Sequence, residues 1–179
     1  DDRSNPVERT TTTDGDGHYF FGGLLSGTYE VRELQPAGYG DGGEVAGSED
    51  GTVSDDYITE VALPPGTNAI NYDFDETRSS ISGTVVVDDD FDGVADAGED
   101  PIKDVEITLT GIDATGQEVN LTTTTDVHGN YEFTGLLGGT YSIQEGSTPG
   151  YIDGGETAGS EGGTEADDNI SDIALPNGT

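Results

Sequence analysis

A tandem repeat constrains the fold of this chain more than any other sequence feature. Residues 10–14 return as residues 122–126, and with this offset of 112 positions more than half of the aligned positions are identical without a gap. Further matches join residues 41–44 to 153–156 and residues 62–64 to 174–176. A duplication of this kind predicts two copies of one structural unit rather than one continuous core.

Apolar residues alternate with polar ones in short runs, which is the pattern of strands buried on one face. In the second copy Val105, Ile107 and Leu109 alternate with Glu and Thr, while Tyr131 and Phe133 share one side of a later run and are predicted to be core. The predicted strands are residues 81–87, 105–109, 119–125, 130–134, 140–145 and 169–175. No run has a helical period, so the sequence predicts an all-β chain.

The junction between the copies falls near residues 76–80, a polar stretch too short for a flexible linker. We expect residues 1–77 to form the first repeat and residues 78–179 the second, as close neighbours in the chain. Asp1 aligns with Asp113. The first repeat is therefore expected to lack its N-terminal strands and the loop between them.

The second repeat is expected to lack its last strand, because Thr179 aligns with Thr67. The segment that follows Thr67 in the first repeat carries Ile70, Tyr72 and Phe74 at alternate positions, as in a strand. Both repeats are thus expected to be incomplete within these 179 residues.

The charge of the chain excludes several classes of function. Its 38 acidic and 5 basic residues give a formal net charge of −33. Such a chain would repel nucleic-acid phosphates and an anionic membrane surface, and no stretch is apolar enough to insert into a bilayer. With so many acids, neighbouring carboxylates arise by chance, and no Trp is present to stack a sugar. We therefore expect no enzyme, no nucleic-acid partner and no membrane insertion.

Residues 88–99 have the ligand spacing of an EF-hand calcium loop, with carboxylates at loop positions 1, 3, 5, 9 and 12 and Gly93 at position 6. The flanking residues read as strands rather than helices. The predicted ligands for Ca²⁺ are Asp88, Asp90, Asp92, the carbonyl of Val94, Asp96 and Glu99. The alternative is a solvated acidic loop, but the complete register favours calcium, and a chain without Cys has no disulfide to stabilise it.

A second metal site is a weaker prediction, made from the Gly- and acid-rich stretch between residues 146 and 168. Its candidate ligands are Asp153, Glu156, Asp167 and Asp168, and they recur in the first copy as Asp41, Glu44, Asp55 and Asp56. The alternative is again a solvated loop. Asp14 with His18, and Asp126 with His128, are explained by turn chemistry instead.

Three blocks of sequence together resemble one known family. They are residues 81–109 with the calcium-like loop, the Gly129-x-Tyr131-x-Phe133-x-Gly135-Leu136 motif, and residues 149–154 followed by Ala158-Gly159-Ser160. In combination they are similar to the SdrD-type B-repeat domain of serine–aspartate-repeat bacterial surface proteins. The resemblance implies two tandem prealbumin-like or CnaB-like Greek-key β-sandwiches, calcium binding, and an extracellular, cell-surface or cell-wall-associated location.

Two functions follow from this reading. The first is a calcium-binding structural spacer, or stalk repeat, of a large bacterial exported or cell-surface adhesin-like protein, whose contacts with host or matrix proteins or glycans are made by other domains. The alternative is an extracellular binding module whose loops at residues 38–56 and 150–168 contact a glycan or protein ligand. The near identity of these loops in both copies favours the spacer.

Overall fold

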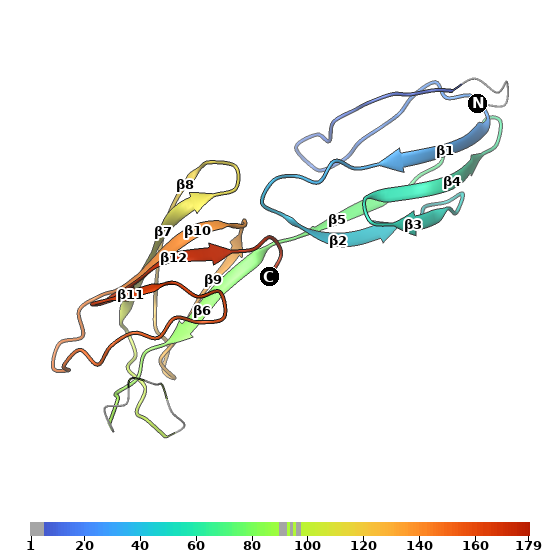
Figure 1. The fold of residues 1–179 in the computed structure, drawn as a ribbon. Helices are drawn as coiled ribbons and strands as arrows, with labels where there is room; N and C mark the ends of the chain where they lie inside the picture. The colour runs from blue at the N-terminus through green and yellow to red at the C-terminus, as the bar shows by residue number, and fades with distance from the viewer. Residues whose placement is uncertain (1–5, 90–92, 94, 96–97) are drawn as a thin grey trace. The chain divides into compact units, whose positions relative to one another are not determined.

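The computed structural model describes residues 6–89, 93, 95 and 98–179. These residues form strands and no helix, so the prediction of an all-β chain is confirmed (Figure 1). The strands are β1 (Gly27–Arg32), β2 (Gly40–Val45), β3 (Thr52–Ser54), β4 (Tyr57–Leu63), β5 (Asp73–Thr77), β6 (Ser79–Thr84), β7 (Glu106–Asp113), β8 (Glu118–Thr124), β9 (Asn130–Leu136), β10 (Gly139–Glu145), β11 (Thr164–Ala166) and β12 (Asn169–Leu175).

The described part of the chain therefore contains no helix that is long and apolar enough to cross a membrane.

The chain divides into two compact units. Unit 1 comprises Asp1–Gln35 and Asp41–Asp75, and unit 2 comprises Pro36–Gly40 and Glu76–Thr179. The division lies two residues before the junction between Thr77 and Arg78 that the repeat predicts. The short segment Pro36–Gly40 also groups with unit 2, although it belongs to the first copy by sequence.

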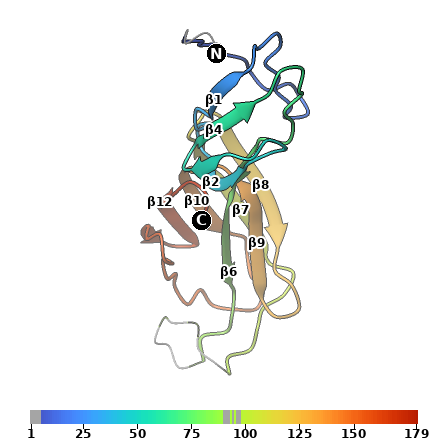
Figure 2. The same ribbon diagram turned by 90° about the vertical axis from the view of Figure 1, so that its right-hand side faces the viewer.

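Unit 2 consists of two sheets around one core. Five strands pair in the order β11-β12-β10-β7-β8, and β6 pairs with β9 in a second sheet (Figures 1 and 2). Both sheets contribute to the core, whose buried residues are Ile102, Val105, Ile107, Leu109, Phe133, Leu136, Tyr141, Ile143, Ile173 and Leu175. Two sheets that share an apolar interior in this way make a β-sandwich.

Unit 1 has a smaller core. Its strands pair in the order β1-β4-β3, and β2 pairs with β5. The buried residues are Ile58, Val61 and Tyr72, and Phe74 packs against them partly buried. The segment that carries Tyr72 and Phe74 therefore completes the core of the first copy. Ile70 is exposed instead, because Asn71 has a φ of 62° and interrupts the alternation.

The sequence repeat is preserved in the strand pairing. Gly27 pairs with Leu63 between β1 and β4, and Gly139 pairs with Leu175 between β10 and β12. Both pairings shift register at the same place, after Tyr29 and after Tyr141. A left-handed residue lies in the partner strand of each pair, with φ 58° at Glu60 in β4 and 57° at Asp172 in β12. The two copies thus share the same bulged strand pairing.

Three short strands lie in stretches that were predicted to be loops, so these predictions were wrong in part. β11 lies within residues 146–168, and β2 and β3 lie within residues 38–56. All residues of β3 and β11 are exposed. None of the three strands has an apolar alternation, and each is defined by its hydrogen-bonded partner instead.

Candidate metal centres

The first candidate site, the loop of residues 88–99, is closed at its base by backbone pairing. Val86 and Pro101 form an isolated β-bridge. The Val87 N–H donates to the Asp100 carbonyl at 2.9 Å, and the Ile102 N–H donates to the Val85 carbonyl at 3.0 Å. These bonds bring the first and last residues of the loop together, as a cation-binding loop requires.

Within this loop the carboxylates at positions 1 and 12 accept backbone hydrogen bonds. Asp88 Oδ2 accepts from the Gly93 N–H at 3.0 Å, and Glu99 Oε1 accepts from the Asp89 N–H at 3.3 Å. Gly93 has a φ of 76°, which is the sharp turn expected at position 6. The other predicted ligands, Asp90, Asp92, Val94 and Asp96, lie outside the described residues.

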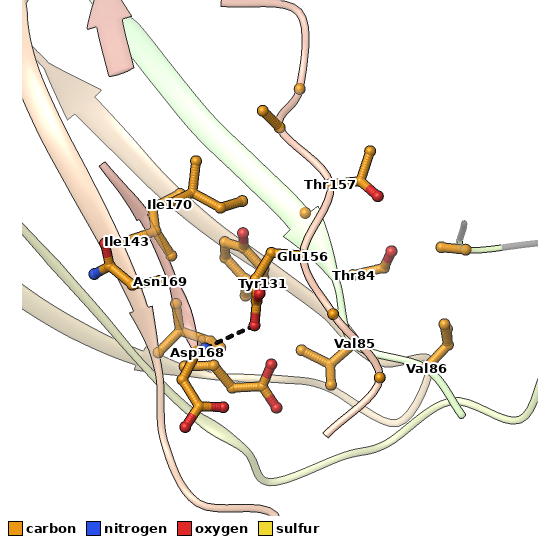
Figure 3. A pocket seen from close by; sticks show the side chains of 18 of the residues that line it. Thr84, Val85, Val86, Tyr131, Ile143, Glu156, Thr157, Asp168, Asn169 and Ile170 are labelled. Carbon is orange, nitrogen blue, oxygen red and sulfur yellow. Dashed lines mark hydrogen bonds between the residues drawn. The ribbon is translucent and has the colours of Figure 1, made fainter. Parts of the chain in front are cut away.

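The second candidate site brings three carboxylates of unit 2 to one point. One ligand oxygen each from Asp153, Glu156 and Asp168 lies within 4.8 Å of the others. Glu156 Oε1 accepts a hydrogen bond from the Asp168 N–H at 2.8 Å, as Figure 3 shows. Asp167, the fourth predicted residue, forms a side-chain hydrogen bond with Asp153 beside this group. All four candidates therefore lie in one neighbourhood.

Unit 1 contains the same arrangement at the equivalent residues. Asp41, Glu44 and Asp56 also place ligand oxygens within 4.8 Å of one another. Glu44 Oε1 accepts from the Asp56 N–H at 2.7 Å, and Asp55 forms a side-chain hydrogen bond with Asp41. Asp56 is left-handed with φ 62°, as Asp168 is with φ 55°. The geometry is thus a property of the repeat rather than of one loop.

The carboxylates of the second site repel one another. Burial first, and then the charges of Asp168, Asp153 and Glu156 in that order, raise the pKa of Glu145 to about 7. Burial, and then the neighbouring aspartates, also raise the pKa of Glu156. The pKa of Asp167 is raised first by its hydrogen bond with Asp153. A bound cation would relieve this repulsion, since an opposite charge favours the ionised carboxylates.

The second site differs in this respect from the acidic residues that form ion pairs. Two ion pairs of the described residues join Lys103 to Asp104 and His18 to Asp14, and neither includes a carboxylate of the second site. Oxygen-only ligands of this kind suit a hard cation such as Ca²⁺ or Mg²⁺.

Sequence reasoning missed Glu145. Glu145 is the last residue of β10. Its carboxylate lies near the second site, because the charges of Asp168, Asp153 and Glu156 all raise its pKa. The signal was present in the repeat, because Glu33 occupies the equivalent position of the first copy. The backbone repeats there as well, since Glu33 and Glu145 each donate an N–H to the carbonyl of the left-handed Asp, at 3.0 Å and 2.9 Å.

A third acidic group is explained by a turn. Asp14 Oδ1 accepts from the backbone N–H groups of Asp16 and His18, at 2.9 Å and 3.0 Å. Asp126 Oδ1 accepts in the same way from His128 and Asn130. These hydrogen bonds lower the pKa of both aspartates. The turn chemistry predicted at Asp14 and Asp126 is therefore observed.

Comparison with known proteins identifies the family. The model of the SdrD B-like domain matches residues 1–76 and 79–176. The chain belongs to the SdrD B-like domain family. The two matched ranges follow the two sequence copies, and the resemblance described above is confirmed.

Curated relatives of this SdrD B-like chain include two staphylococcal proteins. Serine-aspartate repeat-containing protein E and bone sialoprotein-binding protein, both from Staphylococcus aureus, are each 37% identical to it over 147 residues. The alignments cover 80% of this chain but only 12% and 13% of the relatives. No solved structure matches the chain.

Membership in this family settles two further points. SdrD B-like repeats are structural parts of surface proteins and not enzymes, so the expectation that this chain is not an enzyme is confirmed. The chain accordingly belongs outside the cell or at the cell surface, as predicted.

Proposed function

We propose that this chain is a calcium-binding structural spacer, a stalk repeat of a large bacterial cell-surface adhesin-like protein. The observation that carries the proposal is the duplicated carboxylate group. Asp153, Glu156 and Asp168 in unit 2 recur as Asp41, Glu44 and Asp56 in unit 1, with the same backbone hydrogen bond from the last Asp to the Glu.

The donor set of the second site fits calcium. Three carboxylates whose oxygens lie within 4.8 Å of one another offer hard oxygen ligands, and Ca²⁺ accepts six to eight of these in irregular geometry. Asp167 and Glu145 lie close enough to add to the negative charge around the ion. The ion would act by neutralising charges that otherwise favour opening of the loop.

The loop of residues 88–99 is proposed as the other calcium site of unit 2. There the closed base of the loop brings Asp88 and Glu99 together. In this proposal Asp90, Asp92, Asp96 and the Val94 carbonyl would supply the remaining oxygens. A further hydrogen bond, from Thr157 Oγ1 to the Gly93 carbonyl at 2.7 Å, links this loop to the stretch that carries the second site. Calcium binding at either of the two sites would then stabilise both the loop of residues 88–99 and the stretch around Thr157.

The spacer role is supported by the connection between the repeats. β5 ends at Thr77 and β6 begins at Ser79, so one residue separates the last strand of the first copy from the first strand of the second. One relative is named for binding bone sialoprotein. We assign contacts with host proteins, matrix proteins or glycans to other parts of the parent protein, with calcium and neighbouring repeats as the partners of this chain.

Thermal unfolding in calcium and in chelator tests this proposal. Extracellular modules bind calcium with dissociation constants of about 0.1–1 mM, so millimolar calcium should stabilise each occupied site by about 1–2 kcal/mol. Sodium chloride at the same ionic strength is the control. An unchanged melting temperature in chelator would contradict calcium binding. Saturable binding to a glycan or matrix-protein array would favour the binding-module alternative.

A further inference from the structure

Strand β8 has a free edge. It is the last strand of the five-stranded sheet of unit 2 and pairs, among the described strands, only with β7 (Figure 1). The pairing runs over all seven residues of β8 without a bulge. The strand contains no Pro and no Lys, and Glu118 at its start is its one charged residue. Beyond Glu118 it therefore lacks the features with which natural proteins usually block an edge strand.

The hydrogen bonds to β7 show which backbone groups of β8 face outward. The Thr125 N–H donates to the Val105 carbonyl at 2.9 Å beyond one end of the ladder, and the Asp113 N–H donates to the Gln117 carbonyl at 3.0 Å beyond the other. In an antiparallel ladder the bonded pairs occur at every second residue, so the odd-numbered residues of β8 bond to β7. The backbone groups that point away from the sheet belong to the even-numbered residues, which are Glu118, Asn120, Thr122 and Thr124.

Leu121 lies at the centre of this edge and is partly exposed. Its partner across the ladder, Leu109, is fully buried, whereas 42% of Leu121 is exposed. Residues that lie opposite each other in a ladder share a face of the sheet, so Leu121 lies on the core face but at the margin of the sandwich. Its neighbours on this face, Val119 and Thr123, are half-buried. The free edge thus offers an apolar side chain as well as backbone groups.

We propose that β8 is a self-association surface, and that its partner is β8 of a second copy of this chain, paired antiparallel about Leu121. In this register Asn120 lies opposite Thr122 of the second copy, and Glu118 lies opposite Thr124. The even-numbered residues then form the hydrogen-bonded pairs, as their outward backbone groups require. The two Leu121 side chains meet in a non-hydrogen-bonded pair, where side chains lie closest.

The charge pattern of β8 favours this register. Each Glu118 carboxylate lies opposite a threonine at the far end of the other strand, so like charges do not face each other across the new ladder. Parallel pairing in register would instead place the two Glu118 carboxylates side by side. The strand is therefore complementary to itself in the antiparallel direction alone.

The charge of the whole chain opposes the association. Two chains with a net charge of −33 repel each other, and pairing of one seven-residue strand makes a small interface. We expect a weak and reversible dimer that forms at high ionic strength, because the Debye length falls to about 3 Å at about 1 M salt. At a cell surface this pairing would join neighbouring copies side by side.

Sedimentation velocity of the whole chain over a range of concentrations tests the surface. Calcium is held at a constant millimolar level, and the proposal does not depend on it because β8 contributes no residue to either candidate metal site. We expect the dissociation constant of the dimer to be at least roughly tenfold lower in about 1 M than in about 0.1 M sodium chloride, because salt screens the repulsion. A chain that stays monomeric in both would overturn the proposal. A dimer that weakens as salt rises would indicate carboxylates bridged by calcium and would overturn it as well.

A matched pair of variants locates the association. Leu121→Lys should abolish the dimer, because it places two ammonium groups opposite each other in the closest pair of the ladder. Val127→Lys is the control, since it changes the charge equally and Val127 is 69% exposed in the turn after β8. It should leave the dissociation constant unchanged. A dimer that survives Leu121→Lys, or that both variants abolish, would assign the association to another surface.

A proline variant tests the contribution of the backbone. Thr122→Pro removes an N–H that points away from β7, so the ladder within the chain is kept while a hydrogen bond to the second copy is lost. We expect a weaker dimer and little change in the melting temperature at low salt. An unchanged dissociation constant would show that the edge of β8 takes no part.

Cysteine cross-linking tests the register and covers the case of a sparsely populated dimer. The chain has no Cys of its own. Leu121→Cys should give a covalent dimer on mild oxidation, because the Cα atoms of a non-hydrogen-bonded pair lie about 4.5 Å apart, within the span of a disulfide. Glu118→Cys should not, since the two residues would lie at opposite ends of the ladder. Equal cross-linking of the two variants, or none at position 121, would overturn the proposal.

Discussion

At the scale of single residues, the carboxylates are better understood from the repeat than from any one motif. The EF-hand-like spacing of residues 88–99 draws attention first, yet the group around Glu156 has the duplicated geometry. Glu145 joins that group only through folding, because burial in unit 2 and three neighbouring charges raise its pKa to about 7. The residues next to Glu145 in the sequence do not show that it lies beside these carboxylates. The repeat does indicate its importance, because Glu33 occupies the equivalent position of the first copy.

The raised pKa of Glu145 predicts an unusual dependence of stability on pH. The ordinary pKa of 4.5 applies to the unfolded chain, so between about pH 4.5 and 7 the native state binds more protons. The free energy of unfolding in chelator should therefore fall as the pH rises through this window.

Denaturant titrations at several pH values check this dependence. Glu145→Gln should reduce the slope, and Glu118→Gln, which changes an exposed glutamate of β8, should not. A slope that survives Glu145→Gln would assign the effect to other carboxylates. Calcium in excess should flatten the profile of the unmodified chain, because the ion favours the ionised carboxylates.

A second prediction at this scale concerns the register of the first loop. Glu99→Gln should lower calcium affinity, because position 12 supplies two oxygens, whereas Asp89→Asn at position 2 should change it little. The Gln side chain keeps an acceptor for the Asp89 N–H, so the loop base is preserved. Isothermal titration calorimetry measures both variants. Equal losses of affinity would contradict the proposed register.

At the scale of strands, a glycine pair gives a prediction about packing. Gly47→Ala should destabilise unit 1 by about 1–3 kcal/mol, because the new methyl group overlaps the Ile70 carbonyl and the segment must shift. Gly159→Ala should be close to neutral in the same chain. Urea unfolding of both variants makes the comparison. A neutral Gly47→Ala would show that residues 69–74 are held less tightly than the structure indicates.

The strands with alternating apolar residues could be predicted from sequence, and those defined by a partner could not. β7, β10 and β12 bury every second residue or nearly so, and each was expected within a few residues of its bounds. β2 reads Gly-Asp-Gly-Gly-Glu-Val and is a strand because β5 pairs with it. The equivalent residues 152–157 of the second copy have no such partner and form no strand.

At the scale of the whole molecule, the two units should differ in stability. The described core of unit 2 has ten buried apolar residues, and that of unit 1 has three. A small core buries little apolar surface, so only a small free energy of unfolding remains once the loss of chain entropy on folding has been offset. We expect two unfolding transitions in chelator, with unit 1 first.

Hydrogen exchange at increasing urea assigns the transitions. The amides of β4 should lose protection before those of β12, although the two strands occupy equivalent positions in their repeats. A single transition in which both strands exchange together would show that the units unfold as one. Calcium should raise both transitions, because each unit contains the duplicated carboxylate group.

The shared bulged register has a consequence for biosynthesis. Because β1 and β10 pair with their partners in the same register and with similar residues, β1 would fit β12 nearly as well as β4. Such an exchange would trap the two copies in a misassembled chain, a characteristic failure of tandem repeats. Synthesis from the N-terminus counters it, since β4 leaves the ribosome long before β12. Refolding of the complete chain from denaturant lacks this order and should yield more of the exchanged product.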